Sequence, residues 1–269
     1  MSRLASTLLT LLLLAQAVLA QSPQPQQPPE PQPAQSQPGP SPDEQYLLQK
    51  ANEHRAEQNL PPLRWDPSLA RAAHDHVVLI LQTAGAAQHQ YPGEPDLKAR
   101  TVLAGARFST ISENVAGNAG SAKEIERSWM NSDVHRANIL DPRLDTVGIA
   151  VVQRHGTYSA VQDFARSVAA LKPEEIEQQA LELLGKRGIK PAASPEATED
   201  ARKTCQQPNT TNGKPILVMQ WDGADLSRLP TDLLKQVPEA PSHTVAVGSC
   251  PSERQGEGFT TYHLAVLLY

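Results

Sequence analysis

Residues 146–164 read TVGIAVVQRHGTYSAVQDF, and this stretch decides the fold. Two runs, Thr146 to Gln153 and Tyr158 to Phe164, are rich in alternating β-branched residues. A loop that contains Gly156 separates them. This pattern predicts two strands joined as an antiparallel hairpin.

Helix signals precede the hairpin. Residues 41–44 (SPDE) combine an N-cap, a proline at the first helical position and a capping-box glutamate. Residues 66–67 (DP) and 121–124 (SAKE) open two further helices, and Ser132 caps a short one. Residues 84–112 are Gly, Ala and polar residues without a sustained period, so we expect mostly loop there. Helices followed by paired strands predict an α+β sandwich.

Charge and composition exclude one class of partner. The chain has 269 residues, enough for one large domain or two ordinary ones. It carries 24 Lys and Arg against 29 Asp and Glu. A phosphate backbone requires a basic surface, so we expect no nucleic-acid partner. Aromatic residues make up only 4% of the chain, too few for a platform on which bases or sugars stack.

The N-terminal 42 residues predict export. In residues 1–20, Arg3 precedes an apolar run and small residues follow it, which is typical of a secretory signal peptide. The run is shorter than the roughly 20 residues that a transmembrane helix needs, so we expect no integral membrane anchor. Residues 21–42 include nine Pro and seven Gln, a composition that predicts a disordered, extended tether. We therefore expect a secreted protein, extracellular or periplasmic.

The last hundred residues predict a second folded part. Helix starts lie at Pro173 and Ser194, and strand-like runs cover 215–221, 244–249 and 259–269. The only two cysteines are Cys205 and Cys250, and pairing is the default in an oxidising compartment. Residues 168–269 are thus expected to form a disulfide-stapled α+β extension, for which no family is evident.

Five segments resemble a known family when they are taken in order. They are 52–76 (NEHRAEQNLPPLRWDPSLARAAHDH), 112–117 (SENVAG), 129–141 (WMNSDVHRANILD), 147–152 (VGIAVV) and 161–165 (VQDFA). Together they resemble the bacterial, SCP-like branch of the CAP superfamily of cysteine-rich secretory, venom-allergen and pathogenesis-related proteins. The resemblance implies a CAP domain over residues 43–167, folded as a three-layer α-β-α sandwich. It also implies secretion and a large cleft.

In that family the cleft is lined by two His and two acidic residues that can hold a divalent metal, usually zinc. Carried over to this chain, the resemblance implies Glu113 of SENVAG, His135 of HRAN and His89 of HQYPGE. Ser132 stands where the fourth acidic residue falls in animal and plant relatives. The candidate cleft residues are therefore His89, Glu113, Ser132 and His135, and the candidate metal ligands are His89, Glu113 and His135. Two imidazoles and a carboxylate can hold zinc and leave one position open.

Each candidate also has a purely structural interpretation. His135 can be a partly buried histidine that hydrogen-bonds to Glu113 and binds nothing. The hydroxyl of Ser132 is expected to accept from the backbone N–H of His135 as an N-cap, which would occupy it and rule it out as a nucleophile. His74 and His76 lie two apart on a helix, so they cannot face one another, and we expect both at the surface or edge.

Three classes of function follow. The leading one is a secreted binding or interaction module whose cleft holds a small apolar, peptide or metal ligand, and it rests on the resemblance. The second is a metal-dependent extracellular hydrolase that uses His89, Glu113 and His135. The third is a structural cell-envelope protein, favoured by the tether. The Gly-x-Ser-x-Gly motif is absent and both cysteines lie outside this domain, so the sequence favours a non-enzyme.

Overall fold

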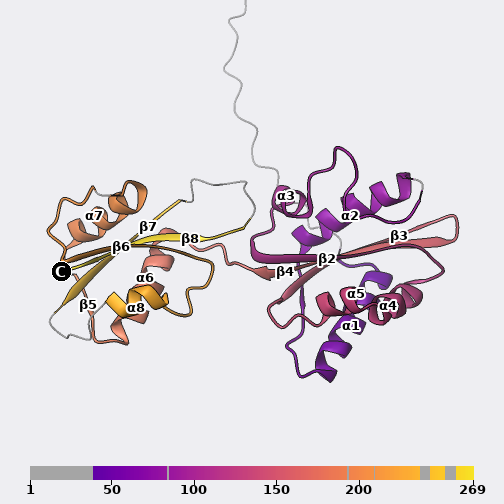
Figure 1. The fold of residues 1–269 in the computed structure, drawn as a ribbon, viewed down its shortest axis with the longest axis horizontal. Coiled ribbons are helices and arrows are strands. Elements are labelled where there is room, and N and C mark those ends of the chain that lie inside the picture. The colour runs from indigo at the N-terminus through magenta and orange to yellow at the C-terminus, as the bar shows by residue number, and fades with distance from the viewer. Residues whose placement is uncertain (1–38, 84, 193, 209, 237–242, 252–258) are drawn as a thin grey trace, which may run out of the picture. The chain divides into compact units, whose positions relative to one another are not determined.

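The computed structural model describes residues 39–269 apart from 84, 193, 209, 237–242 and 252–258. The predicted signal peptide, residues 1–20, and most of the predicted tether, residues 21–38, lie outside the described residues. The described chain contains two four-stranded sheets, each with its own helices (Figure 1). Buried apolar side chains pack around each sheet. Fold class is therefore α+β, as predicted.

The first sheet is built around the predicted hairpin. Strands β3 (Thr146–Arg154) and β4 (Thr157–Ser167) pair antiparallel, and His155 and Gly156 between them both have positive φ. That geometry suits a tight two-residue hairpin turn. The two-residue strand β1 (Arg64–Trp65) pairs parallel with β3, and β2 (Phe108–Ala119) pairs antiparallel with β4. The strand order is β1-β3-β4-β2.

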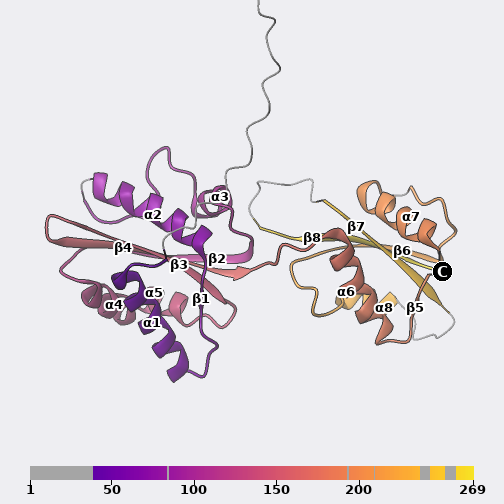
Figure 2. The same cartoon turned by 180° about the vertical axis from the view of Figure 1, so that it is seen from behind.

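Helices cover both faces of this sheet. Helices α2 (Pro67–Gln82) and α3 (Leu97–Leu103) lie on one side of it, and α1 (Pro42–Glu57), α4 (Ala122–Asn131) and α5 (Asp133–Ile139) lie on the other (Figure 2). Each face has its own apolar cluster, one with α2 and one with α1, α4 and α5. This is the three-layer α-β-α arrangement that was expected.

The predicted N-caps are present at the starts of three of these helices. Ser41 and Glu44 form a complete capping box at the start of α1. Asp66 accepts two backbone N–H groups at the start of α2, and Ser121 accepts the N–H of Glu124 in α4. Each cap satisfies donors that the first helical turn leaves without partners.

One local expectation holds in part and another was wrong. Residues 84–112 are mostly loop, as expected, but they also contain α3 and the first five residues of β2. Ser132 does occupy the N-cap position of α5, but its side chain makes no capping hydrogen bond. Its hydroxyl is therefore not held by the backbone N–H of His135, and the argument that the cap occupies it fails.

The outer edge of β2 is protected by side chains. Trp129 Nε1 donates to the carbonyl of Val115 at 3.2 Å, and Asn138 Nδ2 donates to that of Glu113 at 3.0 Å. These bonds fix α4 and α5 beside the edge strand and satisfy carbonyls that would otherwise be open to pairing. Glu113 is thereby placed at a fixed position next to α5.

The second sheet follows the predicted elements closely. Helices α6 (Pro173–Gly185) and α7 (Pro195–Gln206) and strands β6 (Leu217–Gly223), β7 (Thr244–Cys250) and β8 (Tyr262–Leu268) match them, while β5 (Lys190–Pro191) and α8 (Thr231–Gln236) were not expected. The order is β5-β7-β8-β6. The predicted disulfide joins Cys205 of α7 to Cys250 of β7 and is confirmed. Among the described residues, no helix is both long enough and apolar enough to cross a bilayer.

Candidate functional site

The candidate site surrounds Glu113, in the middle of the edge strand β2. Its carboxylate is almost fully buried, with a side-chain exposure of 2%. His89, in the connection between α2 and α3, reaches it from the surface, and His89 Nδ1 lies 2.7 Å from Glu113 Oε1. The His89 side chain remains 60% exposed. The hydrogen bond to Glu113 is the largest cause that raises the pKa of His89.

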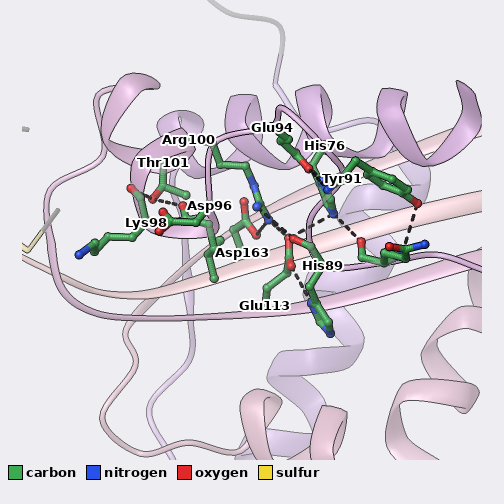
Figure 3. A network of polar contacts seen from close by, with 12 residues as sticks. His76, His89, Tyr91, Glu94, Asp96, Lys98, Arg100, Thr101, Glu113 and Asp163 are labelled. Carbon is green, nitrogen blue, oxygen red and sulfur yellow. Dashed lines mark hydrogen bonds and ion pairs between the residues drawn. The ribbon is translucent and has the colours of Figure 1, made fainter. Parts of the chain in front are cut away.

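A buried cation holds the other side of the same carboxylate. Arg100 of α3 donates from its guanidinium to Glu113 Oε2, and one of its nitrogens lies 3.9 Å from Asp163 Oδ1. Figure 3 shows Glu113 between the side chains of Arg100, His76 and His89. Both oxygens of Glu113 are thus engaged within the protein, Oε1 by His89 and Oε2 by Arg100.

His76 belongs to this network, and the expectation that it lies at the surface or edge was wrong. It is fully buried on α2, where Nδ1 lies 2.6 Å from Glu94 Oε1 and Nε2 lies 2.9 Å from the carbonyl of Gln88. Its Nε2 is also 3.8 Å from Glu113 Oε2. His74, two residues earlier, is exposed as expected. The signal for His76 was available, because it lies three residues after Ala73 and four before Ile80 on the buried helix face.

Asp163 of β4 is the most deeply buried acid in the network. It lies directly opposite Glu113 in the β2–β4 pairing, and neither of its carboxyl oxygens has a hydrogen-bond partner among the described residues. Burial, and then the charge of Glu113, raise its pKa well above the usual value. Sequence analysis overlooked Arg100, Glu94 and Asp163, although Glu94 ends the HQYPGE segment of His89 and Asp163 lies in the VQDFA segment.

The last of the predicted ligands is His135. It is half-buried on α5, and its Nδ1 is buried without a hydrogen-bond partner in the described part of the chain. Burial, and then the charge of His89, lower its pKa. The hydrogen bond to Glu113 that its purely structural interpretation offered is absent, since that carboxylate accepts from His89 and Arg100 instead. No hydrogen bond joins Ser132 to His135 in the described residues, so the two do not form a serine–histidine pair.

The side chains around Glu113 suit the guanidinium of Arg100, which is part of the protein, better than a bound metal ion. Arg100 already contacts the carboxylate that zinc would need, and a dication placed there would be repelled by the guanidinium. In the described residues no group of three or more His, Cys, Asp or Glu side chains is arranged to hold a metal ion. The assignment of His89, Glu113 and His135 as metal ligands therefore stays a prediction.

Comparison with known proteins shows a similarity to one family over the first sheet and its helices. The sequence model of the cysteine-rich secretory protein family, CAP, matches residues 48–164. The chain is 30% identical over 112 residues to the uncharacterised protein YkwD of Bacillus subtilis strain 168, a match that covers 41% of this chain and 42% of that relative. The chain thus spans less than half the length of that curated relative.

Two solved structures are similar over about half of the chain. An extracellular SCP-domain protein from Bacillus anthracis is 26% identical, with a TM-score of 0.43, over 48% of this chain and 45% of that one. An outer surface protein from Borrelia burgdorferi is 19% identical, with a TM-score of 0.43, over 46% of this chain and 92% of that one. The family match runs from within α1 to within β4, so the part of the chain that holds the first sheet is similar to the cysteine-rich secretory protein family, CAP, and to a bacterial relative that shares this region.

Proposed function

We propose that residues 43–167 act as an extracellular binding module whose ligand contacts His89 and His135. The observation that carries this proposal is the exposed imidazole of His89, which is hydrogen-bonded on one side to the buried carboxylate of Glu113. His89 is fixed by the Glu113 contact at Nδ1, while its Nε2 makes no hydrogen bond among the described residues and the side chain is 60% exposed. An imidazole preorganised in this way loses little freedom when it binds a ligand.

The charge of the site favours a ligand with a carboxylate or similar acceptor. Because the pKa of His89 is raised, its ring keeps both N–H donors to higher pH than an ordinary histidine. The Nδ1 donor is used by Glu113, so the Nε2 donor is available for a charge-assisted bond to an anionic acceptor. A short peptide with a free carboxylate has this chemistry.

An extracellular location is supported by two features of the chain. Residues 1–20 are a predicted signal peptide, and Cys205 and Cys250 form a disulfide. Disulfides persist in oxidising compartments outside the cytosol. Both features therefore favour export.

A titration followed by NMR tests the proposal. The probe is a set of N-acetylated tripeptides with free carboxylates, and the readout is the ring signals of His89 and His135. We expect saturable shifts that His89→Ala weakens at least about tenfold, the cost of one lost charge-assisted bond. His74→Ala removes an exposed histidine of α2 outside the network and is the matched control. Equal binding by His89→Ala and the wild type would overturn the proposal.

A further inference from the structure

The two sheets of this protein have the same topology. The order β1-β3-β4-β2 of the first is matched by β5-β7-β8-β6 in the second. In each, a two-residue strand pairs parallel with a longer one and the other pairings are antiparallel. A helix precedes each short strand, α1 or α6, and another follows it, α2 or α7. Residues 173–268 therefore repeat the strand arrangement of the CAP domain.

The strand registers agree residue by residue. Arg64 pairs with Thr146 in the first sheet and Lys190 pairs with Thr244 in the second, which makes the two threonines equivalent. Pro67 and Pro195 open the helices that follow. Counted from these prolines, the three buried positions of α7 coincide with three of those of α2. They are Asp200, Ala201 and Thr204 in α7 and Ala72, Ala73 and His76 in α2.

Close helix–sheet contact is also repeated. A Cβ on Gly148 of β3 would clash with the backbone of α2 at Leu69 and Ala70, and a Cβ on Gly248 of β7 would clash with the backbone of α7. Both glycines let a helix rest directly on the sheet. The two glycines are not at equivalent positions, because Gly248 matches Ala150, and each unit makes the close contact at a different point of the equivalent helix and strand.

The first sheet with its helices and the second sheet with its helices form two equivalent units. They differ in the segment that covers the side of the equivalent helix, which is α2 in the first unit and α7 in the second. In the first, residues 83–107 connect α2 to β2 and contain α3. That connection supplies Ala106 and Val102, which pack with Phe108, Leu69 and Ala165. In the second, α7 and β6 are joined by residues 207–216 only, whose described residues hold no helix. The covering segment of the first unit has no counterpart there.

A pocket of about 840 Å³ lies at this position in the second unit. Its lining includes Ala197, which is equivalent to Leu69, and Tyr269, which is equivalent to Ala165. Gly213 also lines it, close to the register position of Phe108. The pocket is thus the space that apolar side chains of the 97–108 segment fill in the CAP domain.

The rim of the pocket carries more negative than positive charge. Glu196 and Glu199 are exposed on α7 beside Lys203. Asp200 is buried, and its two oxygens accept the N–H groups of Asn212 and Gly213, so it serves the fold and not a ligand. A partner with Lys or Arg next to its apolar side chain would complement this rim.

We propose that this pocket binds a short helical segment of another protein that carries an apolar side chain beside a Lys or Arg. The segment would take the place that residues 97–108 hold in the CAP domain. That helix presents Val102 to the apolar cluster and carries basic Lys98 and Arg100. Helix-in-groove binding uses this combination of an apolar anchor and a charged flank.

A peptide of this chain provides the probe. The N-acetylated, C-amidated peptide of residues 96–108 (DLKARTVLAGARF) is labelled and titrated with the full chain, its disulfide intact, and binding is read by fluorescence anisotropy. We expect saturable binding. Ala197→Leu gives α7 the side chain of the equivalent Leu69, occupies part of the pocket where the apolar anchor would sit, and should weaken binding about tenfold or more.

Charge is tested separately. Replacing Glu196 and Glu199 by Gln should weaken binding about threefold to fivefold at low salt, and the difference should vanish at high salt. Glu182→Gln removes an exposed carboxylate of α6 and is the matched control. A peptide with Phe108→Ala and Val102→Ala should lose binding. Thermal melting of each protein variant confirms that it folds.

Four results would overturn the proposal. The first is no saturable binding of the peptide, and the second is wild-type affinity of Ala197→Leu. The third is equal binding of the alanine-substituted peptide, which would mean that an acidic surface attracts any basic peptide. A dimer that Ala197→Leu dissociates in sedimentation would assign the pocket to a second copy of this chain and would equally overturn it.

Discussion

Glu113 on β2 and Asp163 on β4 are direct cross-strand neighbours, and both carboxyl groups are buried. Two adjacent buried carboxylates cannot both be charged without a large cost, and Arg100 beside them supplies one positive charge. Arg100 pairs with Glu113, while burial, and then the charge of Glu113, raise the pKa of Asp163. This relationship gives the site a defined pH dependence.

Asp163→Asn tests that relationship through stability. The folded-state pKa of Asp163 lies above its unfolded value of about 3.9, so its protonated form contributes stability fully below that pH and loses it as pH rises through the folded pKa. Asparagine keeps the shape without the charge. We expect the variant to gain stability relative to the wild type as pH rises from about 4 to 8. Urea unfolding at several pH values measures this, and a difference that does not change with pH would contradict it.

His89 should titrate above an ordinary histidine. Its bond to Glu113 raises its pKa, so the stability that its protonated ring contributes is full below the unfolded value of about 6.5 and is lost as pH rises through the folded pKa. In Glu113→Gln the pKa of His89 should fall, because the charged partner is gone. NMR titration of the ring signals gives both values, and an unchanged pKa in the variant would refute the Glu113 contact.

Zinc binding tests the predicted ligand set of His89, Glu113 and His135. We expect weak binding in the wild type, because Arg100 contacts Glu113 Oε2, and stronger binding in Arg100→Gln. Binding should increase from pH 5.5 to 7.5, about one unit either side of an ordinary histidine pKa, because imidazoles bind metal only when neutral. Calorimetry on wild type and His135→Ala is the measurement. Equal binding by these two at pH 7.5 would place the metal elsewhere.

The Cys205–Cys250 disulfide should stabilise the second sheet unit. It closes a loop with a sequence separation of 45 residues. Such a loop gives up to about 4 kcal/mol in the chain-entropy account. Replacing both cysteines by Ala should lower the free energy of unfolding by up to that amount, measured by urea denaturation. An unchanged denaturation midpoint would show that the bond does not restrict the unfolded chain.

Gly148→Ala and Gly248→Ala should both destabilise the protein. Each added methyl group would clash with helix backbone, which cannot move as a flexible side chain can. The cost should be about 1–3 kcal/mol or more. Gly185→Ala is the control, since nothing lies within 4 Å of its added Cβ. Melting temperatures compare the three, and wild-type stability of either sheet variant would contradict the repeated close contact.

Short-range patterns determined most of the fold. The hairpin of β3 and β4 follows from alternation and a two-residue turn, and α1, α2 and α4 follow from their caps. These features depend on neighbours within about four residues, because capping and turn formation are local. For the same reason two helices and three strands of residues 168–269 could be predicted without a family.

Strand β2 could not be predicted in this way. Its burial pattern does not alternate, because one edge faces α4 and α5 and the middle of the strand faces a polar network. A strand of this kind acquires its pairing from β4, which lies about fifty residues later in the chain. Pairing with β4 therefore makes this segment a strand, and the pattern of its own residues does not predict it.

The sequence by itself determined that His89, Glu113 and His135 were worth singling out, since the resemblance to a family placed them. Only the tertiary structure decided what Glu113 contacts. Arg100 and Asp163 reach it from α3 and β4, and His76 approaches it from α2, because packing two helices on one sheet face buries their polar groups together. Buried charges must find partners wherever the fold places them, so contacts across long sequence separations decide the chemistry of this site.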